Sequence, residues 1–143
     1  MVLGSNPRPA QEDTSAPVLI VVGAHPRAER LDRPVAYDLA REPRWAGSPL
    51  ILTDLWYLNH PQLTETPTVS VGPPDRNALT ASLADRLPAV WAIDGRELVQ
   101  MDTQTGVPLA ACWGEGEKAT ETAVDAFVRR HLAAFLDAVV PAR

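Results

Sequence analysis

The sequence predicts an α/β fold: a three-layer α/β/α domain whose mixed sheet has parallel central strands and antiparallel hairpin strands at one edge. Short continuous apolar runs alternate with helical patterns in the first half of the chain, which is typical of a parallel sheet. The pair Asp94-Gly95 lies between two β-like runs and indicates a hairpin. An apolar period of about 3.6 residues near the end predicts a long C-terminal helix.

The first half of the chain supplies the parallel strands of this prediction. Residues 18–22 are β-branched and apolar, as in a strand that is buried on both faces. A charged loop at 24–30 leads to a helix at about 33–42. The apolar run 50–58 is expected to be the second strand, and residues 59–61 turn the chain.

The second half reads as one more strand–helix unit followed by hairpins and the final helix. A polar link at 62–65 comes first, and Asp75 is expected to cap the next helix. The elements expected after that link are a strand at 67–72, a helix at about 76–86, strands at 89–93, 96–102 and 107–113, and a helix at about 117–139.

Length and composition favour one domain. The chain has 143 residues, of which 45% are hydrophobic, which is enough for a single core. Residues 1–16 hold little that could be buried and predict a disordered leader, so residues 17–143 form the expected α/β domain.

Several functional classes do not fit the composition. A net charge of −5 argues against nucleic-acid binding, which needs clustered lysine and arginine. The single cysteine, Cys112, excludes an internal disulfide and is expected in the core. Apolar runs stay below the roughly 20 residues of a membrane span, and no secretory signal begins the chain. We therefore expect a soluble, cytoplasmic protein.

The loops at the carboxyl ends of the parallel strands are the expected place for a site. They comprise residues 25–30, 54–60 and 72–77, and the loop 113–117 could join them. Prolines 73 and 74 remove N–H groups that a phosphate cradle would use. The spacing of the three histidines suits no metal site, so no metal is expected.

Asp54 is the leading catalytic candidate, with His25 or His60 as its partner. A carboxylate within an apolar run must be paired or hydrogen-bonded, because burying it alone is costly. Two interpretations stay open. Either Asp54 binds neighbouring loop backbone or an arginine such as Arg76, or it is a general acid or base with a raised pKa.

Five further polar residues are candidate ligand-binding groups. The arginines of the first loop either are solvated surface charges or bind a phosphate group. Asn77 either fixes a neighbouring loop or binds a polar ligand. The candidate ligand-binding residues are Arg27, Arg30, Asn59, Arg76 and Asn77.

Two stretches resemble known families. Residues 18–30, with Ala24-His25-Pro26-Arg27, resemble the start of flavodoxin-like quinone reductases, where a comparable loop holds flavin phosphate. Residues 67–132 resemble a segment of archaeal surface-layer proteins, in which a strand ending Val-Gly-Gly-Pro precedes a helix with Asn and an Ala-Thr helix closes the unit. Here Pro73 replaces the second glycine. The first resemblance implies a flavin, and the second implies a compact non-enzymatic module.

Two functional hypotheses follow, and whether the protein is an enzyme stays open between them. The first is a non-catalytic α/β domain without a cofactor that binds a small polar ligand or a protein partner. The alternative is a small flavodoxin-like oxidoreductase or hydrolase that uses Asp54. A homodimer is also considered, because one small core does not easily bury all of the aromatic residues Trp45, Trp56, Tyr57 and Trp91.

Overall fold

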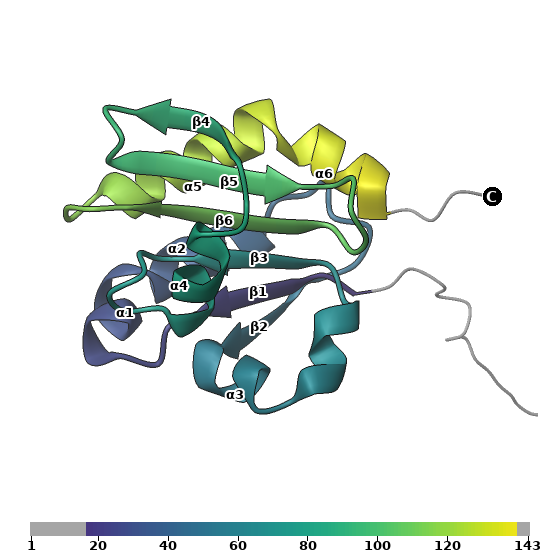
Figure 1. Ribbon diagram of the computed structural model, residues 1–143, viewed down its shortest axis with the longest axis horizontal. Coiled ribbons are helices and arrows are strands. Elements are labelled where there is room, and N and C mark those ends of the chain that lie inside the picture. Colours follow the sequence, from purple (N-terminus) through teal and green to yellow (C-terminus); the bar gives the residue numbers. More distant parts are fainter. Residues whose placement is uncertain (1–16, 140–143) are drawn as a thin grey trace, which may run out of the picture.

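The structure is a computed structural model that describes residues 17–139. One six-stranded sheet, in the order β2-β1-β3-β6-β5-β4, lies between two layers of helices (Figure 1). The strands are β1 (Leu19–Val22), β2 (Leu50–Thr53), β3 (Thr68–Val71), β4 (Ala89–Ile93), β5 (Glu97–Asp102) and β6 (Leu109–Gly114). The helices are α1 (Pro26–Leu31), α2 (Arg33–Ala40), α3 (Asp54–Leu58), the 3-10 helix η3 (Pro61–Glu65), α4 (Ala78–Ala84), α5 (Ala119–Arg130) and α6 (Leu132–Val139).

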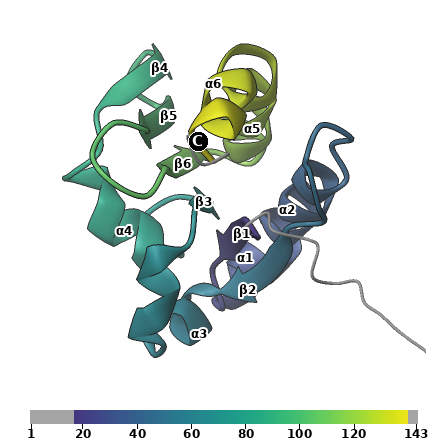
Figure 2. The same ribbon diagram turned by 90° about the vertical axis from the view of Figure 1, so that its right-hand side faces the viewer.

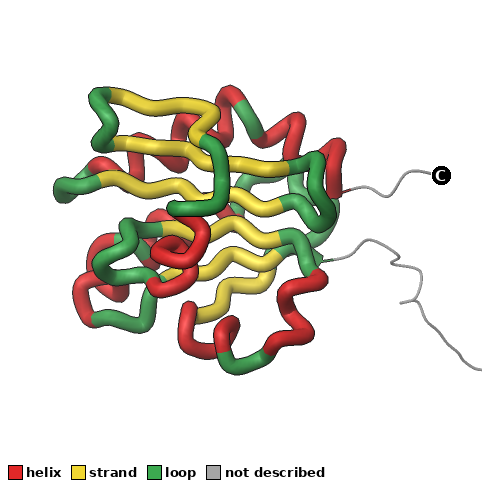
Figure 3. Tube along the Cα trace, in the orientation of Figure 1, coloured by secondary structure: helices red, strands yellow, loops and turns green. Residues whose placement is uncertain are grey.

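The strand directions confirm the predicted mixed sheet, and Figure 3 shows its strands side by side. Strands β2, β1, β3 and β6 run parallel, while β5 is antiparallel to β6 and β4 is antiparallel to β5. The predicted hairpin joins β4 to β5. Asp94 and Gly95 both have positive φ, and the Arg96 N–H donates to the Ile93 carbonyl at 2.9 Å. Glycine and aspartate tolerate this left-handed backbone, which explains the signal in the sequence.

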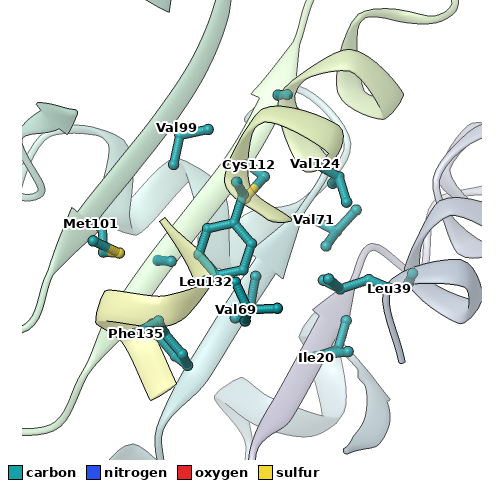
Figure 4. Close-up of a cluster of buried hydrophobic side chains, with 14 of the residues drawn as sticks. Ile20, Leu39, Val69, Val71, Val99, Met101, Cys112, Val124, Leu132 and Phe135 are labelled. Carbon is teal, nitrogen blue, oxygen red and sulfur yellow. The ribbon is translucent and has the colours of Figure 1, made fainter. Parts of the chain in front are cut away.

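Each face of the sheet has its own layer of helices (Figure 2). Helices α2, α5 and α6 cover the first face, and α3 and α4 cover the second. Alternation along β1 sends Ile20 and Val22 to the first face and Leu19 and Val21 to the second. The larger cluster, on the first face, includes the fully buried Phe135 and Cys112 (Figure 4).

A buried glutamine joins the smaller layer to the antiparallel edge. The Gln100 amide on β5 donates to the Ala84 carbonyl at 2.9 Å and to the Leu87 carbonyl at 2.8 Å. Its own carbonyl oxygen accepts from the Trp113 indole N–H at 2.8 Å. A side chain from the sheet therefore binds the last carbonyl of α4 and the Leu87 carbonyl in the turn after it.

Three segments differ from the predicted secondary structure. The second half of the predicted strand 50–58 is helix α3, because Thr53 Oγ1 accepts from the Trp56 N–H at 3.2 Å and starts a helical turn. The predicted loop after β1 contains helix α1, whose N-cap is His25 and whose first residue is Pro26. The polar link after α3 forms the 3-10 helix η3.

Helix boundaries also differ from the prediction. The long C-terminal helix is divided at His131 into α5 and α6, although the His131 N–H still donates to the Phe127 carbonyl at 2.8 Å. Helix α4 is capped by Asn77, not by Asp75. The predicted leader at 1–16 lies outside the described residues. Within residues 17–139, the helices are too short or too polar to cross a membrane.

Cys112 provides a test of the core. Its thiol is fully buried in the centre of the sheet, and burial raises its pKa well above the usual value. We expect the folded protein to resist a thiol reagent such as DTNB at mildly alkaline pH, and the protein in guanidinium chloride to react fully. Equal reaction rates in the two states would contradict this placement.

Candidate functional site

Polar residues from three parts of the chain meet at the carboxyl edge of the parallel strands. Four buried side chains form what we call the carboxyl-edge cluster: Asp32, Asp54, Arg76 and Asn77. They come from the junction of α1 and α2, the start of α3, and the turn between β3 and α4.

Asp54 connects three loops through its carboxylate. Oδ1 accepts from the N–H of Ala24 at 3.0 Å and of Leu55 at 2.8 Å, and Oδ2 accepts from the N–H of Ala78 at 2.7 Å. The side chain is 5% exposed. These bonds correspond to the interpretation in which Asp54 binds neighbouring loop backbone. They join the chain after β1 to the starts of α3 and α4.

Arg76 pairs with Asp32 and not with Asp54. Nε lies 2.7 Å from Oδ2 and Nη2 lies 2.9 Å from Oδ1, so the guanidinium and carboxylate meet through two parallel hydrogen bonds. Both residues are buried, at 6% and 0% exposed. The hydrogen bonds from Arg76 to Asp32 raise the pKa of the guanidinium, against the opposing effect of burial.

Two glycines make room for this ion pair. A Cβ atom at Gly23 would lie 1.8 Å from the carbonyl oxygen of Arg76, and one at Gly72 would lie 2.7 Å from Asp32 Oδ2. Gly72 also has a φ of +115°, which other residues rarely adopt. Because these positions lack a side chain, the end of β1 can approach the backbone of Arg76 and the end of β3 can approach the Asp32 carboxylate.

Asn77 uses both ends of its amide. Oδ1 accepts from the N–H of Leu79 at 2.9 Å and of Thr80 at 3.1 Å, which caps α4. Nδ2 donates to the carbonyls of Val71 at 2.9 Å and Val21 at 3.3 Å. The geometry corresponds to loop fixing, because α4 is attached to the ends of β3 and β1.

The histidines have partners within their own elements. His25 Nδ1 accepts from the Arg27 N–H at 3.0 Å, so its ring caps α1. His60 Nδ1 lies 2.7 Å from the Trp56 carbonyl oxygen, and its ring stacks on Trp56 with centroids 4.2 Å apart. Within residues 17–139, no hydrogen bond joins either histidine to Asp54.

The remaining predicted ligand-binding residues lie on the surface. Arg27 and Arg30 are exposed on α1. Asn59 is exposed at the end of α3, where Nδ2 donates to the Leu55 carbonyl at 2.9 Å. The structure therefore brings Asp54, Arg76 and Asn77 together. Arg27, Arg30 and Asn59 lie outside the cluster.

Two cavities lie away from the cluster, beside α5. One, of about 510 Å³, lies between α2 and α5, and the other, of about 430 Å³, lies between β4 and α5. Among the residues that the structure describes, no group of three His, Cys, Asp or Glu side chains could hold a metal ion.

Comparison with known proteins found no matching family model, no matching curated protein and no matching solved structure. The resemblances to surface-layer proteins and to quinone reductases therefore stay predictions. The assignment of function depends on the geometry of the chain itself.

Asp54→Asn tests the structural role of the carboxylate. An amide NH₂ would face backbone N–H donors that now bind an oxygen, so we expect the free energy of unfolding to fall by about 1–3 kcal/mol. Urea denaturation measures the loss, and Asp137→Asn at an exposed residue of α6 is the control. A variant as stable as the parent would return Asp54 to the role of general acid or base.

A double-mutant cycle tests the buried ion pair. Arg76→Met leaves the Asp32 carboxylate buried without its partner, and we expect a loss of about 3–5 kcal/mol. The double variant Asp32→Leu/Arg76→Met should be more stable than Arg76→Met alone, because no charge then stays buried. Additive losses in denaturant unfolding would contradict the coupling.

Proposed function

We propose that this chain is a non-catalytic α/β domain that binds a protein partner through one edge of its sheet. The observation that carries the proposal is the distribution of exposed apolar side chains. Seven large hydrophobic residues are exposed among residues 17–139, and four of them lie between positions 50 and 58. These four are Leu50, Leu55, Trp56 and Leu58. We call this surface the β2–α3 edge.

The carboxyl-edge cluster gives little support to a catalytic alternative. Its carboxylates, guanidinium and amide are buried and bound to one another or to backbone. A catalytic acid or base has to reach a substrate proton within hydrogen-bond distance. Because these side chains hold the loops together at the strand ends, they favour a structural role for the carboxyl-edge cluster.

Strand β2 offers free backbone groups at this edge. It is the outermost strand and pairs with β1 alone. The Leu50 N–H donates to the Val18 carbonyl at 3.0 Å, so alternation along the strand points the N–H groups of Ile51 and Thr53 away from β1. An exposed edge of this kind is a template for another strand.

Helix α3 adds apolar side chains beside that strand. Asp54 and Tyr57 face inward, while Leu55, Trp56 and Leu58 are 56%, 55% and 47% exposed. Trp56 is held by its stack with His60. Of the four aromatic residues considered for association, Trp56 is the exposed one, whereas Trp45 and Tyr57 are buried and Trp91 is partly buried.

The chemistry of the edge suits a protein more than a small polar ligand. The one charged side chain between positions 50 and 58 is Asp54, and it is buried. On a chain with net charge −5, this neutral surface is where a second copy can approach with little repulsion. Two β2 strands can pair antiparallel about a two-fold axis, so the partner we propose is a second copy.

The location that we propose for the protein is the cytoplasm, which suits a chain whose single cysteine is unpaired in the fold.

Self-association through the β2–α3 edge can be measured directly. We expect the mass from sedimentation or light scattering to rise with concentration, and Trp56→Lys to keep the chain monomeric and folded. Ile93→Lys is the matched control, because Ile93 is a 44% exposed apolar residue on the opposite edge strand. A parent that stays monomeric, or a dimer that survives Trp56→Lys, would refute the proposal.

A further inference from the structure

A second surface, separate from the β2–α3 edge, lies on the first face of the sheet. Helices α2 and α5 lie side by side there (Figure 2), and between them runs a groove of about 510 Å³. The residues that line it belong to these two helices and to the turn after α2. They are Val35, Asp38, Leu39, Glu42, Glu121, Thr122, Val124, Asp125 and Val128.

The floor of the groove is apolar. Leu39 and Val124 are buried and belong to the core, while Val35 and Val128 are partly buried. Val35 and Leu39 are four residues apart on α2, and Val124 and Val128 are four residues apart on α5. Each helix therefore presents one apolar stripe to the groove.

The rim of the groove is acidic. Asp38 and Glu42 line one side, Glu121 and Asp125 line the other, and no lysine or arginine is among the lining residues. Three of these carboxylates already pair with arginines of the chain: Asp38 with Arg41, Glu42 with Arg44, and Asp125 with Arg129. The Asp125 and Asp38 pairs are largely exposed and contribute little, so a partner's cation can replace them.

The chain itself places one guanidinium at this groove. Arg44, in the loop after α2, bonds through Nε to Glu42 at 2.8 Å and donates from Nη2 to the Val128 carbonyl at 2.9 Å. One arginine thus connects the rim of α2 to the backbone of α5. The contact shows how a basic side chain can be bound there, by a carboxylate and a helix carbonyl together.

From these features we propose that the α2–α5 groove binds a basic amphipathic helix of a partner protein. Two adjacent helices leave a groove that a third helix can fill. Apolar side chains at i, i+4 and i+7 of the partner would cover the valine and leucine floor, and flanking lysine or arginine would meet the four carboxylates. A partner strand is disfavoured because the open edges of the sheet lie elsewhere, at β2 and β4.

A set of synthetic peptides tests this site on the full chain. The probe is a helical peptide with leucine at i, i+4 and i+7 and lysine or arginine on both flanks. One control peptide has the same composition in scrambled order, and another has glutamate in place of each basic residue. We expect the first peptide alone to bind, with amide chemical-shift changes in the labelled protein confined to α2 and α5.

Charge reversal separates the groove from general attraction to an acidic protein. Glu121→Lys on the rim should weaken binding about threefold to tenfold. Glu65→Lys, an exposed residue of η3, makes the same change in net charge outside the groove and should leave the affinity unchanged. Trp56→Lys should also bind normally, so failure of this proposal is distinguishable from failure of the β2–α3 edge. Absence of binding, equal binding of the scrambled peptide, equal effects of the two reversals, or shifts elsewhere would overturn the inference.

Discussion

The N–H groups that follow the parallel strands need hydrogen-bond acceptors, and the buried Asp54 carboxylate accepts from three of them. Because Ala24, Leu55 and Ala78 follow different strands, one side chain determines how their loops meet. Asn77 repeats the same arrangement with an amide, since it binds both strand carbonyls and helix N–H groups. The positions of α3 and α4 depend on these bonds.

Strand-end polar residues in an α/β fold invite a catalytic interpretation, but here the same residue types serve a structural purpose. A buried ion pair such as Asp32–Arg76 adds little net stability, because desolvation offsets the attraction. The ion pair does favour one arrangement of the loops, because the two buried charges are paired only when Asp32 meets Arg76. The surfaces that we propose for recognition lie outside the cluster, at the apolar β2–α3 edge and in the acidic-rimmed α2–α5 groove.

Much of the fold can be predicted from local sequence. The β-branched run of β1, the Asp94-Gly95 turn and the apolar period of α5 each express a local preference that the tertiary structure keeps. Residues 54–58 could not be predicted in this way, because Leu-Trp-Tyr-Leu suits a strand as well as a helix. Bonds to Ala24 and Ala78, 30 and 24 residues away in sequence, accompany the helix. The site shows the same limit. Asp54 and Asn77 could be recognised from the sequence as candidate site residues. The partner of Arg76, Asp32, could not, because it lies 44 residues away and no local pattern indicates the pair.

The three-way bonding of Asp54 also has a consequence for the order of folding. Ala24 and Ala78 are 30 and 24 residues from Asp54 in sequence, so these contacts carry the entropy of closing two long loops. We expect this edge to consolidate late and to open as one cooperative unit, in which α3 and the first turn of α4 exchange their amide protons together.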